Sequence, residues 1–417
     1  MNEKIMILSQ FIKTRWFCHF KNRAALEKHQ NKLRSKQLEF VRKNSGFYQE
    51  HSDFPIIDKK VFMERFDDIN TVGLNKEESM NFAIECEKSR DFSNKLKGVT
   101  VGLSSGTSGH RGIFLVSDRE RALWAGTVLA KVLPKSHFFH VRVAFFMRAD
   151  SELYETVKSS LIKFKFFDMQ KDMEGHLQEL QEFQPTILAA PPSCLMRIAK
   201  WNDKGQIKPL KVISIAEVLE QSDAEVIKAA FGVDVVHQIY QCTEGFLGVT
   251  CEYGTLHLNE EMIQIEKEQL DEQRFIPIIT DLKRQAQPII RYRLNDVLVE
   301  KKEPCKCGSP CLALEKIEGR QDDVFEFSGK NGTVSVFPDF IRRCILFADD
   351  VGEYRVQQIS ASEIVILADD LTETSKRQII NEFEKLAEQL DFTVPKISFE
   401  PYKYDIKYKL KRVERLC

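Results

Sequence analysis

Apolar and polar residues follow two different spacings in the middle of the chain. Short, almost wholly apolar runs such as those at 141–147 and 210–217 predict buried β-strands. The stretches between such runs carry apolar residues three or four positions apart, which is typical of amphipathic helices. In one of them Ser222 is a suitable first cap and Gly232 a suitable end. Strand and helix alternate from about residue 97 to about residue 240, and this order predicts an α/β sheet.

The pattern changes after about residue 246. Short strands and turns follow, and from about residue 321 a small module begins with a hairpin, a helix, two strands, a second helix and a final strand. A chain of 417 residues is longer than one hydrophobic core usually supports. We therefore expect a large α/β domain with a β-rich end at 1–320 and a small α+β domain at 321–417.

Composition narrows the class of protein. Hydrophobic residues make up 43% and charged residues 29%, as in ordinary soluble proteins, and the net charge of −1 gives no field that would attract nucleic acid. No apolar run is long enough to predict a membrane span, and the first residues do not resemble a secretion signal. Ten cysteines in a chain of this length do not form a disulfide framework. We expect a cytoplasmic protein without nucleic-acid or membrane partners.

A loop of small residues lies between the predicted strands at 99–103 and 111–117. It consists of Ser104, Ser105, Gly106, Thr107, Ser108 and Gly109. Backbone N–H groups and hydroxyls on such a loop can hold a phosphate, although a plain polar turn has the same composition. Because the loop joins strand to strand, it differs from the two common phosphate loops that lead from a strand into a helix.

Three further polar motifs follow predicted strands. Thr243 and Glu244, in "YQCTEG", have the oxygen atoms that bind Mg²⁺ and a phosphate. Asp296, in "RYRLND", can accept hydrogen bonds from two ribose hydroxyls, and "EGRQDD" lies at the predicted domain boundary. Each motif taken alone is also compatible with an ordinary polar strand end or turn.

Taken in order, these motifs resemble the adenylate-forming superfamily. The order is SSGTSG, then Ala216-Glu217, then YQCTE, YRLND and GRQDD, and finally a lysine near the C-terminus in "KLKRV". The chain is most similar to the phenylacetate–coenzyme A ligase branch, and within it to adenylate-forming enzymes labelled coenzyme F synthetase-like. The resemblance covers residues from about 40 to 417. It implies an acyl-CoA synthetase-like fold, with a large α/β domain and a small mobile lid.

The resemblance also implies a reaction. A carboxylic acid and ATP would give an acyl-AMP, followed by thioester formation on coenzyme A or an acyl carrier protein, with Mg²⁺ as a cofactor. Two alternatives stay open. One is a nucleotidyl ligase that attaches AMP to a cofactor, and the other is a nucleotide-binding relative without catalytic activity. A homodimer is compatible with the sequence.

The resemblance assigns a role to each matching position. The loop from Ser104 to Gly109 would wrap the ATP phosphates. The other assignments are Ala216 and Glu217 beside the adenine, with Tyr240 and Gln241 next to it; Thr243 on a phosphate and Glu244 on Mg²⁺; Asp296 on the ribose, with Arg320 close by; Asp322 and Asp323 at the hinge; and Lys409 on the α-phosphate and the carboxylate.

Two departures from the family pattern affect these assignments. The lysine that usually follows the phosphate loop is missing, so His110 or Arg111 would supply a cation there, or the loop would hold phosphate with hydroxyls and N–H groups alone. The glycine that usually precedes the last lysine is Tyr408, which leaves Lys407 and Lys411 as alternatives to Lys409.

Cysteine and histidine residues gather in two neighbouring stretches. Cys305, Cys307 and Cys311 lie in one and Cys251 and His257 in the other, and thiolates with an imidazole are typical ligands of tetrahedral Zn²⁺. The resemblance to the ligase branch favours Cys251, His257, Cys305 and Cys307 as a structural zinc site, with Cys311 as a spare ligand. Free reduced thiols are the alternative.

Two charged or titratable residues outside these motifs have competing interpretations. His237 lies in an apolar run, which favours a core histidine over a ligand. Arg148 follows a predicted strand and is compatible with binding a substrate anion or with an ordinary ion pair.

Overall fold

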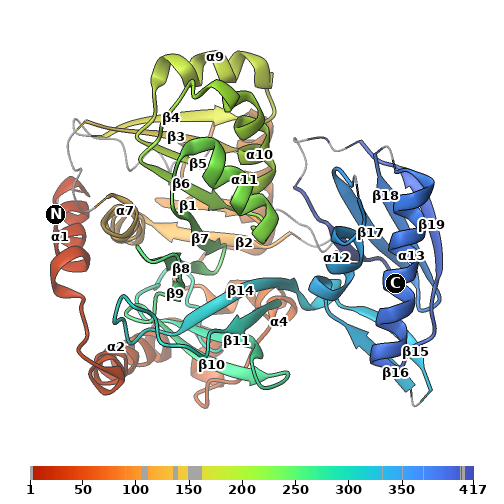
Figure 1. Cartoon of the computed structure of the whole chain (residues 1–417). Helices are drawn as coiled ribbons and strands as arrows, with labels where there is room; N and C mark the ends of the chain where they lie inside the picture. The colour runs from red at the N-terminus through yellow and green to blue at the C-terminus, as the bar shows by residue number, and fades with distance from the viewer. Residues whose placement is uncertain are drawn as a thin grey trace. The chain divides into compact units, whose positions relative to one another are not determined.

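The computed structural model describes residues 3–89, 91–104, 111–134, 140–148, 162–330, 332–349, 351–369, 371–403, 405 and 409–417. The chain forms two compact units (Figure 1). The large unit comprises Met1–Leu294 and Glu300–Glu315, and the small unit comprises Asn295–Val299 and Lys316–Cys417. The small unit therefore starts slightly before the expected boundary and includes a segment from earlier in the chain.

A mainly parallel sheet forms the centre of the large unit. Its parallel strands lie in the order β4 (Ile162–Asp168), β3 (Val141–Met147), β5 (Ile187–Ala190), β6 (Lys211–Ile215) and β7 (Val236–Cys242). The sheet continues in antiparallel fashion through β8 (Gly245–Thr250), β9 (Leu256–Leu258) and the first residues of β14 (Ala313–Arg320). The predicted α/β sheet is thus confirmed, and β5 is buried at every position, as expected of a central parallel strand.

Helices α9 (Met173–Phe183), α10 (Pro192–Trp201) and α11 (Gln221–Phe231) connect successive parallel strands from β4 to β7. Helix α7 (Asp118–Val132) leads from β2 into β3. Gly232 ends α11 with a left-handed φ of 66°, as predicted. The prediction that Ser222 caps the helix is wrong, because α11 already begins at Gln221. Its N-cap is Glu220, which makes no side-chain capping bond.

The N-terminal region is helical as well. Its elements are α1 (Glu3–Ile12), a π-helical turn (Lys13–Phe17), α2 (Arg23–Asn44), α3 (Gly46–Glu50), α4 (Lys59–Glu64), α5 (Phe66–Ile69) and α6 (Lys76–Ser89). Figure 1 shows α1 beside α7. The two helices pack at Gly126, where a Cβ atom would lie only 2.5 Å from the carbonyl oxygen of Ile7. Glycine is therefore required for this close approach.

Two antiparallel groups of strands complete the large unit. Strands β1 (Val99–Leu103) and β2 (Ile113–Ser117) form a hairpin, so the serine- and glycine-rich segment does join strand to strand. Strands β10 (Ile263–Gln269), β11 (Arg274–Asp281) and β12 (Tyr292–Arg293) pair in that order. In the described part of the chain, the helices lack a long apolar stretch that could span a membrane.

The small unit is an α+β fold, as the sequence predicts. Its elements are β13 (Asp296–Glu300), a 3₁₀ turn (Gln321–Asp323), the hairpin of β15 (Phe325–Gly329) and β16 (Gly332–Val336), helices α12 (Pro338–Leu346) and α13 (Glu373–Leu390), and a sheet in the order β19 (Lys396–Pro401), β18 (Glu363–Ala368), β17 (Tyr354–Ser360) and β20 (Val413–Arg415). Phe325, Phe327, Ile379 and Phe383 are fully buried in its own hydrophobic core.

Candidate active site

The carboxyl ends of two neighbouring parallel strands bring the predicted nucleotide motifs to one edge of the sheet. Ile215 of β6 lies opposite Ile239 of β7, so the residues that follow each strand leave the sheet on the same side. Ala216 has a left-handed φ of 65°, and the N–H of Glu217 donates to the carbonyl of Ile215 at 2.8 Å. This tight, strained turn ends the strand, and such strain is typical of functional positions.

Glu217 is held by neighbours within the large unit. Its carboxylate, only 2% exposed, accepts hydrogen bonds from Arg148 at 2.7 Å and from the Ser193 hydroxyl at 2.8 Å. Arg148 therefore forms an ion pair with a buried carboxylate. The assignment of Glu217 to the adenine environment stays a prediction.

Tyr240 and Gln241 are consecutive residues of β7, and the pairing with β8 shifts register between them. Tyr240 is 7% exposed. The Gln241 side-chain oxygen accepts a hydrogen bond from the indole N–H of Trp124 on α7 at 2.9 Å. That bond fixes the Gln241 side chain against α7, and its role in cofactor binding stays a prediction.

Thr243 and Glu244 form the polar centre of this edge. The Thr243 hydroxyl donates to one Glu244 oxygen at 2.8 Å, and the Tyr292 hydroxyl donates to the other at 3.1 Å. Burial, with the Glu244 carboxylate as the second cause, raises the pKa of the Tyr292 phenol far above its usual value. Tyr292 is therefore a permanent donor that orients Glu244.

A buried arginine fixes the backbone at the same place. Arg284 is 8% exposed and donates to the carbonyl oxygen of Thr243 at 2.7 Å and to the side chain of Gln287 at 2.9 Å. The sequence reasoning missed Arg284 and Tyr292. The signal that could have found Arg284 is a charged residue between the apolar runs at 274–281 and 288–290, where a core is expected.

A small pocket opens next to Glu244. Its polar lining comes from distant parts of the sequence: Lys59, Gly112, Thr243, Glu244, Arg284 and Tyr292. A carboxylate, a hydroxyl and a cation around one small hollow match what a metal-bound phosphate needs.

The base of the predicted phosphate loop lies at this pocket. Ser104 and Gly112 face each other across the loop, because the Ser104 N–H donates to the Gly112 carbonyl at 2.8 Å and the Ser104 hydroxyl accepts from the Gly112 N–H at 2.7 Å. The remaining loop residues lie outside the described residues: Ser105, Gly106, Thr107, Ser108, Gly109 and His110.

The Arg111 side chain contacts Glu87 and the Ser104 backbone and is not part of the pocket lining. Its guanidinium forms a two-pronged ion pair with Glu87 of α6, at 2.5 and 2.7 Å, and its Nε donates to the Ser104 carbonyl at 3.0 Å. Because both carboxylate oxygens of Glu87 are matched, the geometry favours a structural role for Arg111 over that of a phosphate-binding cation.

The remaining nucleotide motifs meet within the small unit. The Nε of Arg320 lies 4.0 Å from an Asp296 oxygen, so the expected proximity of these two residues is present. Asn295 donates to Asp322 at 2.5 Å, which links "RYRLND" to "GRQDD". The roles of Asp296 and Arg320 in binding a ribose stay predictions.

The C-terminal lysines differ in their surroundings. Lys411 is paired with the buried Asp323 at 2.7 Å and with Glu414 at 3.3 Å, so it stabilises the small unit from within. Lys409 is half-buried, and its catalytic role stays a prediction. Lys407 and Tyr408 lie outside the described residues.

The predicted zinc ligands come together in the large unit. The ligand atoms of Cys251, His257, Cys305 and Cys307 all lie within 4.8 Å of one another. The Cys251 and Cys305 sulfurs are 3.6 Å apart, and the Cys307 sulfur is 3.3 Å from the His257 Nε2. Ligands of a tetrahedral zinc ion are separated by roughly 3.5–3.8 Å, so the geometry fits this metal.

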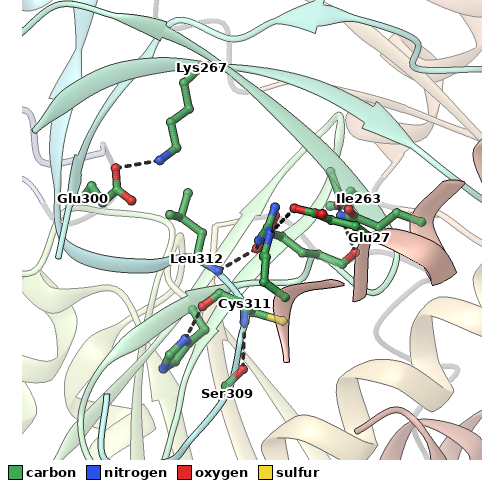
Figure 2. Close-up of polar contacts among 11 residues, drawn as sticks. Glu27, Ile263, Lys267, Glu300, Ser309, Cys311 and Leu312 are labelled. Atoms are coloured by element: carbon green, nitrogen blue, oxygen red, sulfur yellow. Dashed lines mark hydrogen bonds and ion pairs between the residues drawn. The ribbon is translucent and has the colours of Figure 1, made fainter. Parts of the chain in front are cut away.

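The surroundings of the cluster orient its ligands. The His257 Nδ1–H donates to the Cys311 carbonyl at 3.1 Å, which leaves Nε2 without a proton and directed at the thiols. Figure 2 shows the Cys311 sulfur directed away from this bond, so Cys311 contributes its backbone oxygen and is not one of the four grouped ligands. The next N–H, of Leu312, donates to the buried Glu260 at 2.6 Å, and Glu260 is paired with Arg23 of α2 at 2.5 Å.

His237 is a core histidine, in agreement with the sequence-based interpretation. It is half-buried on β7, and its Nδ1 lies 3.3 Å from the Thr250 carbonyl. Burial, and secondarily the charge of Lys211, lowers the pKa of His237 to about 4. The ring is therefore neutral at physiological pH.

Comparison with known proteins shows the fold. No protein-family model matches the sequence, and neither does any curated protein sequence. The structure is similar to that of 2-hydroxyisobutyryl-CoA ligase in the postadenylation state with 2-HIB-AMP, with a TM-score of 0.69 and 15% identity over 93% of this chain and 88% of that chain.

Two other solved structures are similar over a smaller part. ATP-bound MatB from Rhodopseudomonas palustris gives a TM-score of 0.52 and 14% identity over 72% of this chain and 63% of that chain. The amide bond synthetase McbA from Marinactinospora thermotolerans gives 0.54 and 12% over 75% and 68%. The chain therefore has the fold of the adenylate-forming ligases.

Proposed function

We propose that this protein is an ATP-dependent adenylate-forming ligase of the phenylacetate–coenzyme A ligase-like branch. The observation that carries the proposal is the Thr243–Glu244 pair, held by Tyr292 and Arg284 at the carboxyl edge of the sheet. The similar structures support it, because one is a 2-hydroxyisobutyryl-CoA ligase in complex with 2-HIB-AMP and another is MatB bound to ATP. The substrate would be a small carboxylic acid.

The first half-reaction follows from the charges involved. A carboxylate oxygen of the acid attacks the α-phosphorus, the bond from that phosphorus to the bridging oxygen breaks, and pyrophosphate leaves with the electron pair. Glu244 would hold Mg²⁺, which neutralises phosphate charge when bound, and Thr243 would donate to a phosphate oxygen. Lys409 would place a cation on the transferred phosphate, where charge builds up in the transition state.

The second half-reaction would transfer the acyl group. A thiol sulfur of coenzyme A or of an acyl carrier protein attacks the acyl carbon, and AMP leaves. Asp296 would hold the ribose in both steps. We also propose that the small domain, 321–417, moves between the two steps, as lids do in many enzymes.

Pyrophosphate exchange with a panel of aryl and aliphatic acids tests this proposal. We expect exchange with at least one acid, followed by thioester formation when coenzyme A or a carrier protein is added. ATP binding without exchange for any acid would favour the inactive relative, and AMP retained in the product would favour the nucleotidyl ligase.

Replacing Lys409 by Ala tests the assignment next to Tyr408, where the sequence departs from the family pattern. We expect Lys409→Ala to lower the exchange rate by at least about 100-fold, because the cation on the transferred phosphate is lost. Lys411→Ala is the matched comparison, and we expect it to lower the melting temperature of the small unit instead, because Asp323 would lose its partner. Unchanged exchange in Lys409→Ala would remove Lys409 from the mechanism.

We further propose that Cys251, His257, Cys305 and Cys307 hold a structural Zn²⁺. Four protein ligands leave no open position for a substrate. Two tight turns that end in glycine, at Gly254 with φ 84° and Gly308 with φ 71°, bring the thiols together. Because thiolate ligands need reduced cysteines, the proposal agrees with a cytoplasmic location. About one zinc per chain in protein purified without added metal is the expected result, and its absence would reject the site.

The proposed oligomeric state is open to a simple measurement. Light scattering on purified protein distinguishes a monomer from the homodimer that the sequence allows.

A further inference from the structure

Helix α1 and the π-helical turn that follows it bury polar residues against α7. Gln10 is the buried residue of α1, and Thr14 is the buried residue of the turn Lys13–Phe17. The Gln10 amide donates to the Thr14 hydroxyl at 2.9 Å and to the Thr127 hydroxyl of α7 at 3.0 Å. The centre of this contact is therefore polar, whereas the inner face of an amphipathic helix is usually apolar.

Large apolar side chains lie on the outer side of the same helix. Five of them are between 39% and 76% exposed, and we name them the outer stripe: Ile5, Leu8, Ile12, Trp16 and Phe17. Steps of three and four residues place Ile5, Leu8 and Ile12 on one face of α1, and Trp16 and Phe17 extend that face into the π-helical turn. Single exposed apolar residues are ordinary, but a continuous group of them marks an interaction surface.

The outer stripe is held firmly on the large unit. Arg15 donates to the carbonyl oxygens of Leu133 and Pro134, each at 3.0 Å, beyond the end of α7. The Trp16 ring packs edge-on against the Phe11 ring with centroids 5.7 Å apart, and Phe11 packs against the core of the sheet. In Figure 1, α1 lies on the outside of the large unit beside α7. The stripe is thus presented on an anchored helix.

Positive charge surrounds the outer stripe. Residues 4–22 contain no Asp or Glu, and their basic residues are Lys4, Lys13, Arg15 and Lys21. The three lysines are exposed. Glu3, which comes just before this segment, is paired with the buried Arg121 at 2.9 Å. The local charge is therefore positive, although the net charge of the whole chain is −1.

This charge decides between two kinds of partner. A second copy of the chain, packed stripe against stripe, would bring lysines of the same sign together, which disfavours association. Five exposed apolar residues are also far fewer than the roughly 20–30 residues that each partner contributes to a stable dimer. An anionic lipid surface has the opposite charge and takes up apolar side chains between lysines, and tryptophan is enriched at such surfaces.

We propose that α1 and its π-helical turn bind the surface of an anionic membrane, with the outer stripe inserted among the lipids and the lysines at the headgroups. The expectation of no membrane partner rested on the lack of a spanning segment and on the net charge. A helix that lies in the surface needs only local charge and a narrow apolar face. The inference is independent of the proposed adenylation.

Sedimentation with lipid vesicles tests the proposal. One set of vesicles contains phosphatidylcholine with about 30% phosphatidylglycerol, and the other contains phosphatidylcholine alone. The variant Leu8→Ser/Phe17→Ser removes apolar surface, and Lys13→Gln/Lys21→Gln removes charge. Melting temperatures establish that each variant is folded.

Matched controls change exposed residues outside α1. Val226→Ser alters an exposed apolar residue of α11, and Lys200→Gln/Lys204→Gln removes two exposed lysines at and after the end of α10. Trp16 provides a second measurement, because bromolipids quench a tryptophan that enters the membrane. Trp16→Phe gives the signal of the other tryptophans.

We expect the wild type to bind the anionic vesicles at least about tenfold more tightly than the neutral ones, and about 0.5 M salt to remove most of the difference. Leu8→Ser/Phe17→Ser and Lys13→Gln/Lys21→Gln should each weaken binding to anionic vesicles by roughly tenfold. Both controls should bind like the wild type, and bromolipids should quench Trp16.

Several outcomes would overturn the proposal. One is equal binding of the wild type to anionic and neutral vesicles, and another is unchanged binding in a folded Leu8→Ser/Phe17→Ser protein. A third is a wild-type dimer, seen by light scattering, that the same double variant converts to monomers, because a second copy would then cover the outer stripe. Since none of these measurements needs substrate, failure of the adenylation proposal would leave this one standing.

Discussion

The Thr243–Glu244 pair and the Cys251–His257–Cys305–Cys307 cluster both belong to the large unit, but their ligand atoms are arranged in opposite ways. The Glu244 carboxylate faces a pocket and is oriented by hydrogen bonds from Thr243 and Tyr292. The four cysteine and histidine ligand atoms face one another within 4.8 Å. The pair is open to a ligand and the cluster is closed, which agrees with the proposed nucleotide site and the proposed structural zinc site.

Removal of the Glu244 charge should give the largest effect on activity. We expect Glu244→Gln to lower pyrophosphate exchange by about 100- to 1000-fold, because the metal ligand is lost while the size of the side chain is kept. The melting temperature should change little. Glu272→Gln, at a carboxylate 91% exposed, is the control and should behave like the wild type. If Glu244→Gln were unstable enough to explain its loss of activity, the contrast between an open site for a ligand and a closed site for stability would be wrong.

Removal of one cluster ligand should instead act on stability. We expect Cys305→Ser to lose zinc and to reduce the free energy of unfolding by about 3 kcal/mol or more, because metal binding and folding are coupled. Cys311→Ser should keep both zinc and stability, since its sulfur is outside the four ligands and its carbonyl remains. Zinc content by elemental analysis and thermal unfolding measure the two quantities. Equal losses in the two variants would contradict the assignment of ligands.

Tyr292 offers a smaller change at the open site. Tyr292→Phe keeps the ring that packs against Phe62 and removes the hydrogen bond to Glu244. We expect an approximately tenfold fall in exchange, caused by a less well oriented carboxylate, together with a loss of about 1 kcal/mol of stability. In a Mg²⁺ titration, the wild type should reach half of its maximal exchange rate at a lower Mg²⁺ concentration than the variant. Identical Mg²⁺ titrations would mean that Tyr292 does not act through Glu244.

The stability of the large unit should also depend on pH, through His237. The pKa of His237 is lowered to about 4 by burial, so as the pH falls below about 6.5 the unfolded chain takes up a proton that the folded chain does not. The contribution of His237 to the free energy of unfolding is therefore fully present above pH 6.5 and is lost progressively as the pH falls to about 4. Between pH 7.5 and 5, we expect the free energy of unfolding of His237→Gln to fall by about 2 kcal/mol less than that of the wild type, measured by urea unfolding. The His237→Gln variant should also retain zinc, whereas the His257→Gln variant should lose it.

Much of the candidate site could be predicted from local sequence. Glu217 and Glu244 were each expected just after a strand, and the structure places both beyond neighbouring parallel strands, β6 and β7. The four residues that the resemblance implied as zinc ligands lie together in the structure, and their role as ligands stays a prediction.

The supporting residues could not be found in this way. Tyr292 and Arg284 are far from Glu244 in sequence, and their contacts depend on how the β11–β12 region packs against the sheet edge. Arg111 was considered as a phosphate cation because of its position in the chain, but its partner Glu87 lies on a helix whose placement no local pattern gives. Tertiary packing decides such cases.

The division of the chain has a practical consequence for exchanging parts between relatives. The small unit takes Asn295–Val299 from one place in the sequence and Lys316–Cys417 from another, with Glu300–Glu315 of the large unit between them. A recombination joint at residue 320 would leave the Asp296 segment behind and separate it from Arg320, 4.0 Å away. Chimaeras with other ligases should therefore be joined before Asn295, so that the whole pair is inherited from one parent.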